Sequence, residues 1–68
     1  APARALTHYR RYLDHGGPLA PEALWGQARA LSALGRTAEA RESWRALVVR
    51  YPRSTYANAA RTKLEPDP

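Results

Sequence analysis

The sequence predicts an all-α protein, a right-handed helical-hairpin solenoid of four short antiparallel helices, and three observations lead to this class. Apolar residues recur every three or four positions and nowhere alternate with period two over four or more residues, which is typical of helices. Glycine and proline divide the chain of 68 residues into four such segments. Parts of these segments recur about 35 positions apart, a period found in helical repeat proteins.

The first predicted helix ends near His15. Leu6, Tyr9 and Leu13 fall three or four positions apart and share one face, whereas most of the arginines of this segment lie on another. A Gly-Gly-Pro sequence follows His15. Glycine accepts the left-handed conformation at a helix C-terminus and proline cannot continue the hydrogen-bond ladder, so the helix stops there.

The second predicted helix runs from Pro21 to Leu34. Proline suits the first turn of a helix, and the carboxylate of Glu22 favours the positive end of the helix dipole. Gly35 ends the helix. The apolar stripe of this helix consists of Leu24, Ala28, Leu31 and Leu34.

The third and fourth helices are expected to start at side-chain caps, Thr37 for the third and Ser54 for the fourth. Pro52 ends the third helix, and the tail 65–68 is expected to be frayed. The buried positions of the third helix are Ala40, Trp44, Leu47, Val48 and Tyr51, and those of the fourth are Tyr56, Ala57, Ala60 and Leu64.

Two segments of the chain repeat. Residues 5–13 match residues 40–48, and residues 19–23 recur in outline as residues 56–60, at shifts of about 35 positions. Such a period predicts hairpin units that stack, each burying the apolar face of its neighbour.

The stretch from Pro21 to Pro52 resembles one complete tetratricopeptide repeat. Leu34-Gly35-Arg36 is similar to the leucine-glycine turn of that family, and Pro52 is similar to its closing proline. Gln27 departs from the pattern, since the family prefers leucine there. The resemblance implies a structural repeat core made of Leu24, Ala28, Leu31, Leu34, Gly35, Ala40, Trp44, Leu47 and Pro52.

On this alignment residues 1–68 form a single domain. It contains a half repeat (3–15), a full repeat (21–52) and a second half repeat (54–64), and the lack of an initial methionine suggests a piece of a longer protein. The connectors also resemble those of bacterial envelope proteins: the cell-division coordinator that binds the Tol system, the outer-membrane assembly lipoproteins, and C-terminal repeats of anti-sigma-type regulators. This resemblance favours the periplasm or cell envelope over the cytoplasm.

The resemblance implies a scaffold or adaptor that binds a peptide or partner helix on its concave face, which the first helix of each pair lines. A tryptophan beside arginine is a combination enriched at interface hot spots. The alternative is that Trp25 only caps the core between stacked helices. The lysine and asparagine of the clamp in chaperone-binding repeats are absent. The candidate groove residues are Trp25, Arg29, Ser32, Ala33 and Arg36.

Two other functions stay open. The net charge of +5 suits a basic module that binds nucleic acid or an anionic envelope surface. The arginines are spread over all four helices among acidic residues, however, so a solvated face or an acidic protein partner explains the charge more simply than nucleic acid does. The chain could instead cap a longer repeat protein or self-associate, because fewer than three repeats are present. The faces expected to meet a copy or the rest of the protein lie around Leu6, Tyr9, Leu13, Tyr56 and Ala60.

Catalysis, cofactors and metals are not expected. The chain has no cysteine. Its two histidines, His8 and His15, lie two helical turns apart, about 10 Å, which is too far for one metal ion. Ser32, Ser43 and Ser54 lack the sequence context of a nucleophile. No run of 18 or more apolar residues predicts a membrane span.

Overall fold

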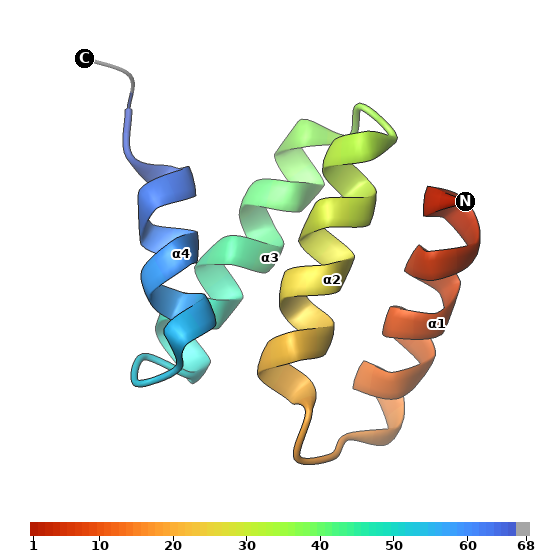
Figure 1. Cartoon of the computed structure of the whole chain (residues 1–68), viewed down its shortest axis with the longest axis horizontal. Helices are drawn as coiled ribbons and strands as arrows, with labels where there is room; N and C mark the ends of the chain where they lie inside the picture. Colours follow the sequence, from red (N-terminus) through yellow and green to blue (C-terminus); the bar gives the residue numbers. More distant parts are fainter. Residues whose placement is uncertain (67–68) are drawn as a thin grey trace.

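The computed structural model describes residues 1–66, and this range contains four α-helices and no strand (Figure 1). The expected all-α, helical-hairpin architecture is confirmed. Of the tail expected to be frayed, residues 65–66 follow the last helix without regular structure, and residues 67–68 lie outside the described range. The helices are α1 (Pro2–His15), α2 (Ala20–Ala33), α3 (Thr37–Arg50) and α4 (Thr55–Leu64).

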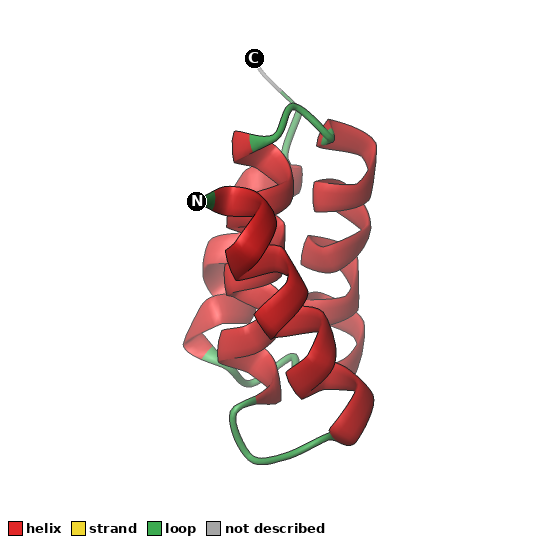
Figure 2. Cartoon of the chain, turned by 90° about the vertical axis from the view of Figure 1, so that its right-hand side faces the viewer, coloured by secondary structure: helices red, strands yellow, loops and turns green. Residues whose placement is uncertain are grey.

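Each helix packs against the next one in the chain, and α2 also contacts α4. By contrast, α1 and α3 make no backbone contact. Figure 1 shows α3 behind α2 and α4, and Figure 2 shows the same molecule from the side of α1. The molecule measures 35 × 27 × 14 Å, a slab whose contacts join neighbouring helices, as in a stack of hairpins.

Glycines end the first two helices, as the sequence predicts. Gly16 has a φ of 77°, and its N–H donates to the carbonyl of Tyr12 at 2.9 Å. Gly35 has a φ of 76°, and its N–H donates to the carbonyl of Ser32 at 3.0 Å. The next N–H, of Arg36, reaches the carbonyl of Leu31 at 2.9 Å. These two bonds form a Schellman motif, which satisfies the last carbonyls of α2.

Of the two expected side-chain caps, one is confirmed and one is wrong. The Ser54 hydroxyl accepts the N–H of Tyr56 at 3.1 Å and caps α4. Thr37 is not a cap but the first residue of α3, and Arg36 precedes it without a side-chain cap. The reason is the short turn: Arg36 closes α2 with its N–H and opens α3 with its carbonyl, which accepts the N–H of Ala40 at 3.0 Å.

The core lies where α2 and α3 face each other. Leu31 and Leu47 are its largest fully buried side chains, each contributing about 1.5–3 kcal/mol to stability. Leu24, Ala28, Ala40 and Trp44 are buried beside them.

Three of the residues assigned to the repeat core are exposed. Leu34, expected on the apolar stripe of α2, is 39% exposed, and Gly35 and Pro52, expected to end helices, are exposed as well. Each lies at or beyond the C-terminal end of its helix, outside the surface where the helices meet. These positions shape turns and do not fill the core.

Small residues let the helices approach closely. Ala28, Ala40, Ala57 and Ala60 are completely buried. In α2, a Cβ atom on Gly26 would clash with the ring of Tyr9, so this tyrosine packs directly on the backbone of α2. The hydroxyl of Tyr12 accepts the N–H of Leu19 at 2.8 Å and ties the first connector to α1.

Candidate functional site

Trp25 lies in α2 and is half-buried. Its ring centroid is 6.1 Å from that of Tyr56 in α4, with the ring planes tilted by 40°. Both side chains pack against the core. Trp25 therefore links α2 to α4, as the capping alternative expects, and still presents part of its ring to solvent.

Arg29 and Ser32 are exposed. They follow Trp25 by four and seven positions, a spacing that places all three on one face of α2. Ala33 is exposed as well and, together with Arg29, lines a hollow of about 320 Å³. The remaining wall of this hollow comes from the N-terminal part of α1 and from Gly26 and Ala30.

Arg36 is engaged elsewhere. Its Nε and Nη2 atoms donate to the two carboxylate oxygens of Glu39 at 2.5 and 2.9 Å. Nη2 of Arg10 lies 3.7 Å from the same carboxylate. The hydrogen bond from Arg36 lowers the pKa of Glu39; desolvation opposes this, and the charges of Arg36 and Arg10 add to it. Among the predicted groove residues, Arg36 alone is held by an ion pair within residues 1–66.

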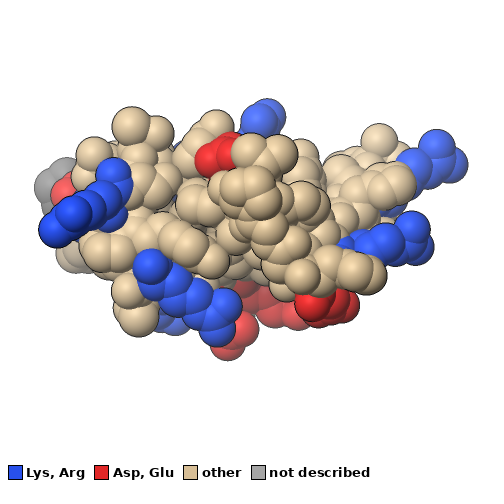
Figure 3. All heavy atoms as spheres, turned by 90° about the horizontal axis from the view of Figure 1, so that it is seen from below, with Lys and Arg blue, Asp and Glu red and all other residues tan. Residues whose placement is uncertain are grey.

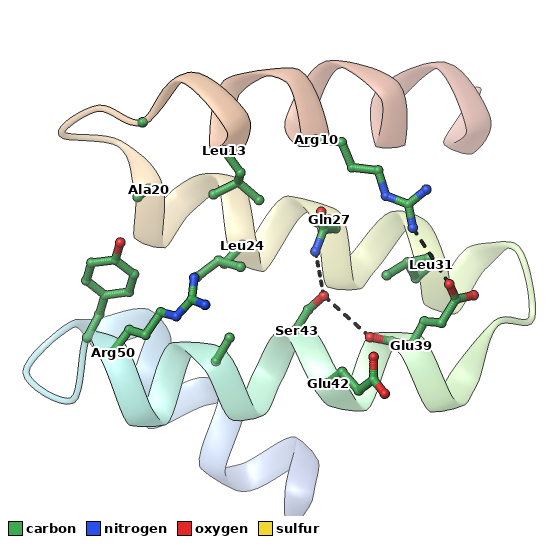
Figure 4. A pocket seen from close by; sticks show the side chains of 13 residues that line it. Arg10, Leu13, Ala20, Leu24, Gln27, Leu31, Glu39, Glu42, Ser43 and Arg50 are labelled. Carbon is green, nitrogen blue, oxygen red and sulfur yellow. Dashed lines mark hydrogen bonds and ion pairs between the residues drawn. The ribbon is translucent and has the colours of Figure 1, made fainter.

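A second groove, of about 340 Å³, lies between α1 and α3 with α2 as its floor (Figure 4). Gln27, the departure from the family pattern, belongs to this floor. Its Nε2 donates to the hydroxyl of Ser43 at 2.8 Å, and that hydroxyl donates to the carbonyl of Glu39 at 3.4 Å. Ser43 is only 4% exposed, so the polar residue of α2 is matched by a buried polar residue of α3.

The faces expected to meet a second copy are partly covered within the chain. Leu6 is 4% exposed and Ala60 is fully buried, while Tyr9, Leu13 and Tyr56 are half-buried. Leu6 and Ala60 therefore offer no surface to a second copy, whereas Tyr9, Leu13 and Tyr56 stay partly accessible, and self-association stays a prediction. The large apolar residues that the structure does expose are Leu19, Leu34 and Val49.

Titratable residues do not gather into a metal site in the described part of the chain. His8 and His15 are both exposed, and no three metal-ligating side chains of residues 1–66 come together. None of the helices is long and apolar enough to cross a membrane, again within residues 1–66.

Antiparallel helices that stack as hairpins, with glycines at the first two turns and small buried residues where the helices pack, define a helical-hairpin repeat protein. The family model described as tetratricopeptide repeat matches residues 22–54, from the first turn of α2 to the cap of α4, and supports a tetratricopeptide repeat protein. Such repeats generally mediate protein–protein interaction and are typically not catalytic. No curated protein and no solved structure matches the chain.

Proposed function

We propose that the chain binds a peptide or helix of another protein through the face centred on Trp25, which α2 and α4 share. The supporting observation is that Trp25 is half-buried against Tyr56, on the same face as the exposed Arg29 and Ser32. The tetratricopeptide repeat match adds to this, since such repeats serve as interaction modules.

The packing of Trp25 suits it to be an anchor. A side chain already held by a neighbouring ring loses little rotamer freedom when a partner covers it, so more of its contact energy goes into affinity. Arg29 adds a charged donor beside the ring and favours an acidic group in the partner. Ser32 and Ala33 leave room for the partner on this face of α2, because both side chains are small. Arg36 contributes little, because Glu39 holds it.

We propose that this face spans the full repeat (21–52), which supplies α2, and the half repeat that follows it (54–64), which supplies α4; another half repeat (3–15) precedes them. The resemblance of the connectors to those of bacterial envelope proteins makes the periplasm the first compartment in which to look for the partner.

The test is the affinity of a partner purified with the chain from its own cell. Trp25→Ala is expected to weaken binding at least tenfold, the effect of a hot-spot residue. Val49→Ala is the matched control, because Val49 is 77% exposed on α3 and has no role in this face. Since Trp25 also touches the core, Arg29→Gln provides a second variant that leaves the packing intact, and it should weaken binding about threefold.

Salt separates this proposal from a basic module that binds nucleic acid or an anionic surface. Binding through Trp25 should keep most of its strength from 50 to 200 mM salt, about the range over which phosphate contacts lose theirs. If all binding disappears over this range and Trp25→Ala has no effect, the proposal is wrong.

A further inference from the structure

We propose a second binding site, for an acidic peptide segment with one apolar side chain, at the end of the molecule where α3 turns into α4. This inference goes beyond the proposed function, because the site shares no residue with the Trp25 face. A hollow of about 470 Å³ lies there, within the size range of small-ligand pockets. Its lining consists of Pro21, Arg50, Tyr51, Pro52, Arg53 and Ser54.

The floor of the hollow is apolar. Tyr51 is half-buried and packs against the core, and the rings of Pro21 and Pro52 stand beside it. Covering such a surface with an aliphatic or aromatic side chain removes apolar area from water and so stabilises the complex. An apolar anchor in the ligand is therefore part of the proposal.

Hydrogen bonds hold the shape of the hollow. The N–H of Ser54 donates to the carbonyl of Tyr51 at 3.0 Å, which closes the turn. Arg61 in α4 donates to the carbonyl of Pro52 at 3.1 Å and to the side chain of Asn58 at 2.6 Å. Because the connector is fixed before a ligand arrives, binding would cost little conformational entropy there.

The charge of the hollow is positive and unmatched. Arg50 and Arg53 are both exposed, neither forms an ion pair with the described residues, and no carboxylate belongs to the lining. In contrast, Arg10 of α1 and Arg36, which precedes the other end of α3, share Glu39. Figure 3 looks onto the end of the molecule where this connector lies. Lys and Arg side chains project at both the left and the right of the view, and the left is the side on which α4 lies in Figure 1.

Arg50 and Arg53 line the hollow together with Tyr51 and the two prolines, so its lining suits a ligand that carries carboxylates next to an apolar residue. Arg50 also lines the groove between α1 and α3, where Figure 4 shows its side chain. Arginine binds carboxylates with paired hydrogen bonds, so the complementarity is both electrostatic and geometric. A nucleic acid fits less well, because its affinity depends on neutralising many phosphates and this hollow offers only two free cations among its lining residues.

The test uses a synthetic peptide with one tryptophan between two pairs of glutamates, titrated into the ¹⁵N-labelled chain. The amide signals of Tyr51, Arg53 and Ser54 should shift and saturate. The double substitution R50Q/R53Q should weaken binding about tenfold, the sum of two exposed ion pairs. R45Q is the matched control, since Arg45 is an exposed arginine of α3 outside the hollow, and it should change the affinity by less than twofold.

Two altered peptides test the charged and the apolar contributions to binding separately. Replacing the glutamates with glutamines should cause the same loss as R50Q/R53Q, and replacing the tryptophan with glycine should abolish saturation. The W25A variant should bind the acidic peptide with the same affinity as the parent chain. A failure of this second site is therefore distinguishable from a failure of the proposed function. Shifts spread over other arginines, an equal loss in R45Q, or tighter binding of a single-stranded oligonucleotide at the same amides would overturn the proposal.

Discussion

Gly35 occupies a backbone conformation that other residues avoid. Its φ of 76° lies in the left-handed region, and the two N–H groups at this turn close α2. A Cβ atom at Gly35 would meet no neighbour, so conformation alone decides the effect of a substitution.

Gly35→Ala should therefore lower the free energy of unfolding by about 1–2 kcal/mol, the cost of the left-handed conformation for a residue with a side chain. Urea unfolding followed by circular dichroism measures this. Gly35→Asn is the control and should cost less, because asparagine tolerates this region better. An alanine variant as stable as the parent would show that the turn is not held in this conformation.

Gln27 and Ser43 are a matched polar pair. Removing one partner leaves the other with weaker bonding: without Gln27, Ser43 keeps only its 3.4 Å bond to the carbonyl of Glu39. Removing both leaves an apolar contact, which is often nearly neutral.

A double-mutant cycle of Gln27→Leu and Ser43→Ala is expected to show a coupling of about 0.5–1.5 kcal/mol in the free energy of unfolding. The double variant should be close to the parent in stability, and Gln27→Leu alone should be less stable although leucine is the residue that the family prefers. Strict additivity of the two single effects would mean that the hydrogen bond contributes nothing.

At the scale of elements, Glu39 is the link between two helices whose backbones do not touch. Its carboxylate in α3 lies 3.7 Å from Arg10 in α1 and accepts two hydrogen bonds from Arg36. The lowered pKa of Glu39 means that the folded state favours the charged carboxylate, mainly through the bond from Arg36. Its contribution to stability is therefore complete above the ordinary carboxyl pKa of 4.5 and is lost as the pH falls through the lower folded value.

Glu39→Gln should make the unfolding midpoint less sensitive to pH below about 5, because the variant has no carboxylate to protonate at this position. Thermal unfolding between pH 7 and pH 2.5 measures the difference. Glu42→Gln is the matched control, since Glu42 is an exposed carboxylate of α3 that forms no ion pair with the described residues. If both variants follow the parent's pH profile, the ion pairs of Glu39, chiefly the one with Arg36, do not contribute to stability in solution.

Helix positions were predictable from sequence to within a few residues because glycine, proline and apolar spacing act locally. The second helix, expected from Pro21 to Leu34, runs from Ala20 to Ala33. The exposure of the Leu34 side chain was not predictable in this way. Its spacing continues the apolar stripe, but whether that position is covered depends on where the neighbouring helix ends.

The candidate site shows the same limit. Trp25, Arg29 and Ser32 share a face because helical spacing places them there. Arg36 follows at the same kind of spacing. It nevertheless forms a hydrogen-bonded ion pair with Glu39, because the turn places the first residues of α3 next to it. The sequence shows Gln27 as a departure from the family pattern and Ser43 as a serine without catalytic context. Their hydrogen bond cannot be predicted from sequence, because it depends on how α2 packs against α3.

At the scale of the whole molecule, we propose that the face around Trp25 contacts a partner protein. Photo-crosslinking in the cell that makes the protein tests it most directly, with the crosslinker at exposed Ser32 and, as control, at exposed Thr7 of α1. We predict one dominant adduct from position 32 that disappears in Trp25→Ala, and none of the same mass from position 7. Equal adducts from both positions, or an adduct from position 32 that persists without Trp25, would contradict the claim.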